Sequence, residues 1–150
     1  MPPQKRTLGR IRFFIVAAYR RGLAIAKPKA EADRSDVQAQ KDCRNLVIRI
    51  GEVAFDLLRA RAFETARVAL EEAVSCWPEC VWLRLIYAHA LMFCANISGA
   101  MRLHREHHHR ILETGESWGA AIRNHFAWLR KAGVEHPVMK EIKRQFAAEV

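Results

Sequence analysis

The residues with the clearest chemical potential are histidines in one short stretch of the chain. His104 precedes His107 and His108 by three and four positions. On a helix, this spacing places the first imidazole one turn from the other two, where neutral rings can chelate a divalent transition metal. The stretch lacks an HExxH motif, a paired Cys-x-x-Cys and an acidic residue at an obvious supporting position. A polar, histidine-rich helix face is the simpler interpretation, so we predict no metal or other cofactor and keep these three residues as the metal alternative.

The same histidines are also candidates for a response to pH. Imidazole changes its charge between about pH 5 and 8. Protonating several neighbours between His104 and His109 would therefore loosen the helix that carries them. A melting temperature that stays constant on mild acidification would contradict this hypothesis.

The sequence gives little support for catalysis. The four cysteines lie in apolar surroundings, which raise the pKa of a thiol and make it inert, and they show no regular disulfide spacing. We interpret them as small buried hydrophobic residues of a reducing compartment, and we predict a cytoplasmic protein. No serine lies in a nucleophile elbow, and no glycine-rich loop could hold a phosphate. We therefore predict that the protein is not an enzyme and has no small-molecule substrate.

The excess positive charge lies at one end of the chain. Of the net charge of +9, eight units come from residues 1–30, which contain no acidic residue. We expect these residues to form a partly helical basic arm, docked by Phe13, Phe14 and Val16 or left mobile, with a hinge at Pro28. The basic residues that we assign to the binding face of the arm are Lys5, Arg6, Arg10, Arg12, Arg20 and Arg21.

Several functions are compatible with such an arm. Clustered arginine and lysine can displace counterions from nucleic acid, and an amphipathic basic helix can lie on an anionic membrane. A basic start followed by an apolar run, with Ala24 and Ala26 placed like a cleavage site, also fits a secretory signal, and an acid-free, arginine-rich start fits an organelle transit peptide. No apolar run approaches the roughly 18 residues that are needed to cross a bilayer.

The helices that carry these residues are clearest between residues 46 and 78. Apolar residues recur every three or four positions on either side of Arg59–Arg61, which predicts two helices joined by a tight turn into an antiparallel hairpin. Pro78 ends the second helix because proline cannot continue the hydrogen-bond ladder. Gly51, inside the first helix, suggests a close approach of another segment.

The spacing within this hairpin resembles the tetratricopeptide repeat, a unit of about 34 residues. We call this interval the repeat spacing. A shift of the chain by the repeat spacing matches Ala54 to Ala88, Leu57 to Leu91 and Ala66 to Ala100, so we expect a second, degenerate repeat. The resemblance is carried in the first unit by Ala54, Leu57, Phe63, Ala66, Leu70, Ala73 and Pro78, and the counterparts of the last three in the second unit are His104, His107 and Leu112.

These patterns together predict an all-α fold of stacked antiparallel hairpins, a short α-solenoid preceded by the basic arm. We place the arm at residues 1–30 and the helical domain at 31–150, with repeats at about 47–80 and 81–112. A capping box of Ser35 and Gln38 should begin the first long helix of that domain. A closing hairpin at about 116–150, with Gly133 at a helix end and Pro137 opening the last helix, is similar to the closing helices of some bacterial repeat proteins.

In stacked hairpins, the first helix of each unit lines a concave surface. We therefore predict a trough for a helical or extended segment of another protein, as in an adaptor or small chaperone. Binding of nucleic acid or an anionic membrane through the arm is the alternative, and self-association could cover the apolar ends. The predicted trough residues are Ile48, Phe55, Arg59, Trp82, Leu85, His89 and Met92.

Overall fold

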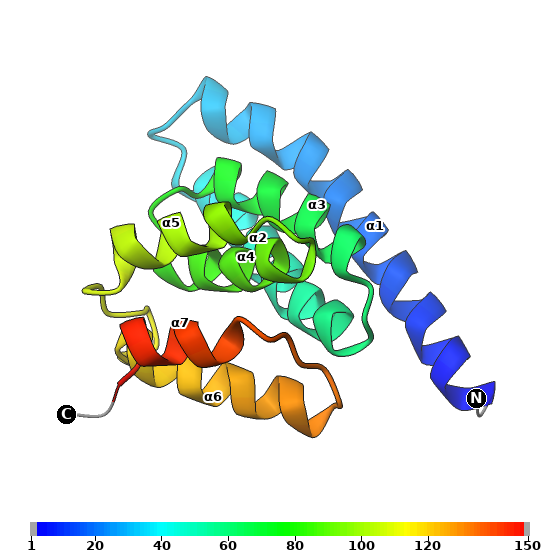
Figure 1. Ribbon diagram of the computed structural model, residues 1–150. Helices are drawn as coiled ribbons and strands as arrows, with labels where there is room; N and C mark the ends of the chain where they lie inside the picture. Colours follow the sequence, from blue (N-terminus) through cyan, green and yellow to red (C-terminus); the bar gives the residue numbers. More distant parts are fainter. Residues whose placement is uncertain (1–2, 149–150) are drawn as a thin grey trace.

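The computed structural model describes residues 3–148, with side chains from residue 10 onward, and its ordered elements are helices (Figure 1). Within this range the only β pairing is an isolated bridge between Ile111 and Ser117. The predicted all-α class is therefore confirmed. In chain order the helices are α1 (Pro3–Ala32), α2 (Val37–Arg59), α3 (Phe63–Cys76), α4 (Val81–Phe93), α5 (Ile97–His107), α6 (Trp118–Lys131) and α7 (Met139–Phe146).

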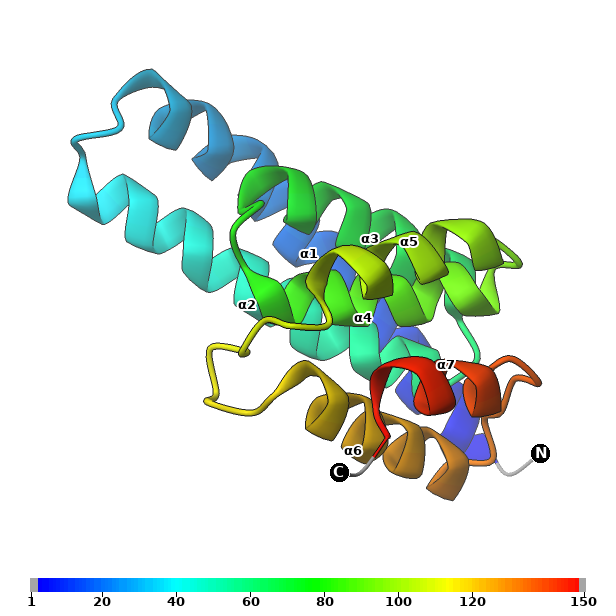
Figure 2. The same cartoon turned by 60° about the vertical axis from the view of Figure 1, so that its left-hand side comes forward.

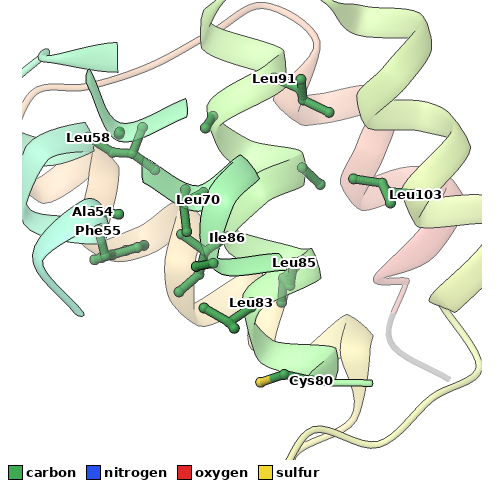
Figure 3. Packing of buried hydrophobic residues seen from close by; sticks show 14 of the residues in the cluster. Ala54, Phe55, Leu58, Leu70, Cys80, Leu83, Leu85, Ile86, Leu91 and Leu103 are labelled. Atoms are coloured by element: carbon green, nitrogen blue, oxygen red, sulfur yellow. The ribbon is translucent and has the colours of Figure 1, made fainter. Parts of the chain in front are cut away.

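Consecutive helices pack side by side from α1 to α5, and α6 pairs with α7 in a last hairpin. This hairpin lies beneath α4 and α5, as both ribbon views show (Figures 1 and 2). The core is one hydrophobic cluster that includes Ala54 and Leu70 of the first predicted repeat and Ile86 of the second (Figure 3). Each hairpin thus covers the apolar face that its neighbour would otherwise expose.

The α2–α3 and α4–α5 hairpins turn in the same way at positions that differ by the repeat spacing. Arg61 and Ala95 both have a left-handed backbone, with φ of 64° and 63°. The amide of the residue after each donates back to the carbonyl of Leu57 or Leu91, at 2.8 and 2.9 Å. These are hydrogen bonds of a Schellman motif, which satisfies the last carbonyls of a helix. Gly133 forms the same motif after α6, with φ of 77°, as expected of a glycine at a helix end.

The two non-glycine residues in these turns lead to a stability prediction. A left-handed backbone costs a residue with a Cβ about 1 kcal/mol, so Ala95→Gly should stabilise the protein by about that amount and raise its Tm by about 2–4 °C. Arg61→Gly should gain less, because the Arg61 side chain also donates to the Gly133 carbonyl at 2.6 Å. Thermal unfolding measures both effects. The control Ala127→Gly, on the exposed side of α6, should lose up to about 1 kcal/mol; an unchanged or lower Tm for Ala95→Gly would contradict the assignment.

Small residues lie where the predicted repeats need close contact between helix axes. Ala54 and Ala66 are fully buried, and so are their counterparts Ala88 and Ala100. The second unit departs from the pattern at His104, which stands where the first unit has Leu70. His104 is nevertheless fully buried, as Leu70 is. The periodicity of the sequence is therefore also a periodicity of the packing.

The predicted arm is a continuous helix, α1, packed against α2 and α3. Its buried contacts are Val16, Leu23 and Ala30, which recur every seventh position. Arg20 fixes it further through two hydrogen bonds to Glu72, at 2.9 and 2.6 Å. Docking by Val16 thus agrees with the sequence, whereas Phe13 and Phe14 point to solvent and do not dock the helix.

Three predicted helix boundaries were wrong. Pro28 is not a hinge: it lies on the exposed side of α1, where the helix continues to Ala32 without its amide donor. The N-cap of α2 is Asp36, whose carboxylate accepts from the Ala39 amide at 3.0 Å, while the Ser35 hydroxyl donates to Asp33. The last helix, α7, begins after Pro137, at Met139.

Candidate binding surface

The trough predicted from the sequence is largely closed by α6. Leu85, His89 and Met92 of α4 are buried, so their prediction as groove residues was wrong. The ring of His89 lies 5.2 Å from that of Phe126 on α6, measured between centroids. The physical reason is that α4 is apolar on nearly all sides, and a helix of this kind is stable only when it is surrounded.

The predicted trough residues of α2 have two different environments. Phe55 is nearly buried, with its ring centroid 5.2 Å from that of His125 and the Arg59 guanidinium 4.9 Å above its face. Arg59 itself is exposed and pairs with Asp56 at 3.5 Å. Ile48, two turns earlier, is only half-buried and faces an open hollow. The predicted trough residues of α2 are therefore divided between the contact with α6, at Phe55, and the open hollow, at Ile48.

This hollow, of about 280 Å³, is lined mainly by apolar atoms. Ile48 of α2 and Trp82 of α4, both predicted from the sequence, lie together in its wall. Its other lining residues, from α2 and the two loops beside it, are Glu52, Trp77, Cys80, Glu113 and Thr114. The structure thus brings two of the seven predicted trough residues into one accessible site, which we call the α2–α4 hollow.

Gly51 lets the Trp82 indole lie directly on the backbone of α2. A Cβ at this position would be 2.6 Å from Trp82 Cζ3 and 2.8 Å from Leu83 Cδ2. Both distances are shorter than a carbon–carbon contact allows, so a side chain here would displace the indole. The close approach expected at Gly51 is confirmed, and it sets the depth of the hollow.

Glu113 holds the far wall of the hollow, and the sequence analysis missed it. Its carboxylate accepts from the amides of Val81 and Trp82, at 2.6 and 3.1 Å. It therefore caps α4, whose own N-cap residue, Cys80, makes no side-chain cap, and its negative charge lies at the positive end of that helix. The one available signal was that α4 begins without a Ser, Thr, Asp or Asn that could cap it. Its first amides therefore need a hydrogen-bond acceptor from another segment.

Histidines form a buried layer between α4, α5 and α6. His89 Nε2 and His125 Nδ1 are 3.1 Å apart, and the Trp118 indole donates to His104 Nδ1 at 3.0 Å. Burial lowers the pKa of His104 and of His125 to about 4, and burial together with the charges of His125 and His104 holds the pKa of His89 well below its ordinary value. These three imidazoles are therefore neutral at pH 7.

The three histidines proposed as the metal alternative do not share one site. His104 is buried and stacks on Phe146, with centroids 5.2 Å apart, whereas His108 is exposed. His107 is half-buried beside Trp118, at 5.9 Å between centroids. Residues 3–148 contain no group of three or more His, Cys, Asp or Glu that is arranged to hold a metal ion. His104 thus packs against aromatic side chains, those of Trp118 and Phe146.

Two of the four cysteines lie against each other across α2 and α3. The Sγ atoms of Cys43 and Cys76 are 2.8 Å apart, and both thiols are free. Burial, together with Cys43, raises the pKa of Cys76 to about 12, and burial raises that of Cys80 to about 11. Neither Cys76 nor Cys80 has the low pKa of a nucleophile at pH 7.

The short distance between Cys43 and Cys76 predicts a specific crosslink. With glutathione disulfide as the oxidant, the two thiols should lose two protons and two electrons, form one bond between the sulfurs and yield two reduced glutathiones. The reaction should be slow because the thiolate is scarce. Thiol titration should fall from four to two, and peptide mapping should find this pair; in Cys80→Ser the count should fall from three to one, with the same pair crosslinked. A crosslink that contains Cys80 or Cys94 would contradict the prediction.

The basic residues assigned to the arm are not equivalent. Arg10 and Arg21 are exposed and Arg12 is half-buried, while Arg20 is occupied by Glu72. Lys5 and Arg6 belong to α1, but their side chains lie outside those that the structure describes. Although α1 spans 30 residues, no helix among residues 3–148 combines the length and apolarity needed to cross a membrane.

Comparison with known proteins gives no match to a family model, to a curated protein or to a solved structure. The resemblance to the tetratricopeptide repeat therefore rests on the residues and the repeat spacing of this chain alone, and it stays a prediction. The site itself belongs to the class of shallow apolar hollows on helical hairpins, so its function has to be argued from its shape and chemistry.

Proposed function

We propose that this protein is a non-enzymatic interaction module, an adaptor or small chaperone, that binds a helical or extended segment of another protein in the α2–α4 hollow. The apolar side chains of the partner would lose water on Ile48 and Trp82. Four free thiols support the cytoplasm as its compartment.

The observation that carries this proposal is the accessible, apolar wall around Trp82. The indole is held from below by the bare backbone of Gly51, and the amide of Trp82 is held by Glu113. Rigid aromatic anchors of this kind lower the entropic cost of binding and are common where interfaces concentrate their energy. A hollow that is prepared in this way needs no rearrangement before a partner enters.

The size of the hollow indicates a side-chain anchor as its occupant. At about 280 Å³ it lies at the lower end of the roughly 300–1,000 Å³ of small-molecule sites. One or two apolar side chains from a longer segment fit such a volume. Glu52 at the rim adds negative charge, which favours a basic residue next to the apolar anchor.

The protonation states of the buried histidines and of two thiols support a non-enzymatic role. The buried histidines are neutral and face aromatic rings, and the thiols of Cys76 and Cys80 have raised pKa values. Of these groups, the hollow is lined only by Cys80, whose pKa of about 11 leaves it protonated at pH 7. Shape and apolar surface are what this site offers to a ligand.

A peptide selection tests the proposal. Peptides displayed on phage are selected on the full chain, and the Kd of the best binders is measured for the wild type and for Ile48→Ser with Trp82→Ala. Loss of an aromatic anchor costs about 2 kcal/mol or more, so the double variant should bind at least about 30-fold more weakly.

Trp128→Ala is the matched control, because Trp128 is an exposed tryptophan on α6, outside the hollow. It should bind the selected peptides as the wild type does. The proposal fails if no peptide is selected above background, or if the selected peptides bind the double variant with unchanged affinity.

A further inference from the structure

We propose that the outer face of α1 binds an anionic lipid bilayer, with the helix lying in the plane of the surface. This inference does not depend on the α2–α4 hollow, because it uses other residues. It rests on an apolar stripe that α1 leaves uncovered, on the charges beside that stripe and on the position of the helix at the edge of the molecule.

The uncovered stripe is opposite the docked face of α1. At about 100° per residue, Ile11, Phe14 and Ile25 lie about half a turn away from Val16 and Leu23. Their exposed fractions are 47%, 75% and 65%, against 2% and 4% for the two docked residues. The helix therefore has two apolar faces, of which the body of the protein covers one.

This stripe and its edges hold most of the exposed large hydrophobic residues whose side chains the structure describes. Among residues 10–148, eight such residues are exposed, and five of them lie on α1. Exposed apolar residues that occur singly need no explanation, but a gathered set marks a surface that is covered in function. The five are Ile11, Phe13, Phe14, Ile15 and Ile25.

The charges beside the stripe are suited to anionic lipid. Arg10 and Arg21 are exposed on its flank, and residues 1–30 contain no acidic side chain. Glu72 of α3 reaches α1 on the docked side, where it is paired with Arg20.

The acidic residues next to the stripe lie toward the C-terminal end of α1, where Asp36 and Asp42 line a hollow with Ile25 and Lys29. The N-terminal part of α1 should therefore lie closest to the bilayer. This part runs past the α2–α3 turn, clear of the body in Figure 1, so a flat surface can approach it.

The combination of aromatic and aliphatic side chains with arginine favours lipid over the other occupants. An interfacial helix buries its apolar face among acyl chains while its cations remain at the headgroups. Nucleic acid would use the arginines but leave Ile11 and Ile25 in water. A second copy would bring two arginine-bearing, acid-free faces together, with like charges opposed.

Vesicle flotation of the full chain tests the inference. The probes are vesicles of phosphatidylcholine alone and of phosphatidylcholine with phosphatidylserine. The protein should float with the anionic vesicles only and be released as salt rises from about 0.1 to 1 M, where the screening length falls from about 10 to 3 Å. Because each arginine near an anionic surface contributes about fivefold in affinity, Arg10→Gln with Arg21→Gln should weaken binding about 25-fold.

A second variant, Ile11→Ser with Phe14→Ser, should weaken binding at least about tenfold at low salt. Both residues are exposed, so its circular dichroism should match that of the wild type. The control, Ile111→Ser with Arg105→Gln, removes the same kinds of groups from exposed positions outside α1 and should float normally.

Three outcomes would overturn the inference. The first is equal flotation with neutral and anionic vesicles, or unchanged flotation of the Ile11/Phe14 variant. The second is no flotation together with salt-sensitive binding of single-stranded RNA, which would assign α1 to nucleic acid. The third is a lipid-free dimer in sedimentation equilibrium that the Ile11/Phe14 variant dissociates, which would assign the stripe to a second copy.

Discussion

Acidification below pH 6.5 should destabilise the protein steeply, long before its carboxylates are protonated. His89, His104 and His125 are buried and neutral, and each has a pKa below the ordinary value of 6.5. Each should reduce the free energy of unfolding by up to about 1.4 kcal/mol per pH unit. Between pH 6.5 and pH 5 the three together would remove roughly 5 kcal/mol, which is comparable with the whole stability of a typical domain.

The direction follows from which state binds protons. Well above pH 6.5 the histidines are neutral in both states, and their contribution to folding is complete. As the pH falls, the unfolded chain takes up protons that the folded core excludes, and the loss continues until the folded pKa of about 4 is reached for His104 and His125. Arg59 lowers the pKa of His125 further and Glu116 opposes this effect, both less than burial does.

Urea unfolding at a series of pH values measures this effect. His125→Phe keeps an aromatic ring in the layer but removes one titrating group, so the slope of stability against pH should fall by about a third. His109→Gln, at an exposed position, should leave the slope unchanged. A free energy of unfolding that is flat between pH 7 and 5 would contradict the buried layer.

The carboxylates of Glu64 and Glu72, whose pKa values are lowered by Arg67 and Arg20, contribute only at lower pH.

Removing the same side chain from both repeats should cost the same amount of stability. Leu57 and Leu91 occupy equivalent positions of the two units, both are buried, and the carbonyl of each accepts the hydrogen bond that closes its turn. Leu57→Ala and Leu91→Ala should each destabilise the protein by about 2–5 kcal/mol, from lost burial and the cavity left behind. Both values should lie within this range if the two units are packed alike.

Chemical denaturation of the two variants, with Ile111→Ala as an exposed control, measures these losses. The control should change stability by less than about 0.5 kcal/mol. If one leucine substitution left stability nearly unchanged while the other strongly destabilised the protein, the hairpins would not be equivalent units. The repeat spacing would then be a coincidence of sequence.

The parts of the fold that could be predicted are those set by local spacing. Ala54, Ala66 and their counterparts in the second unit were expected at close helix contacts, and they are fully buried. A small residue that recurs on an apolar helical stripe indicates that a neighbouring helix packs closely at that point. The roles of Gly51 and Gly133 could also be predicted from local features. Gly51 allows another segment to approach the helix backbone closely, and Gly133 adopts the positive φ of a helix end.

The parts that could not be predicted depend on which distant segment covers a face. The closing hairpin does not follow the repeat spacing, so nothing in the sequence indicated that α6 would cover His89 of the expected trough. Glu113 is a similar case, because a carboxylate that caps a helix 32 positions earlier has no local signature.

The histidines illustrate the same limit. His104, His107 and His108 are neighbours in the sequence, but His104 packs on Trp118 and Phe146, and the buried layer is completed by histidines of α4 and α6. Spacing on one helix predicted a shared face, whereas tertiary packing placed one residue in the core and another in solvent. The predicted pH response stays a hypothesis, now with different residues.

The most direct test of the account is where a bound segment touches the protein. In a titration of the isotope-labelled full chain with a selected peptide, the Trp82 indole N–H and the Ile48 methyl resonances should shift most, with the Trp128 indole N–H nearly unchanged. If the largest shifts fell instead on α6 or on α1, with Trp82 and Ile48 unaffected, the α2–α4 hollow would not be the site of recognition.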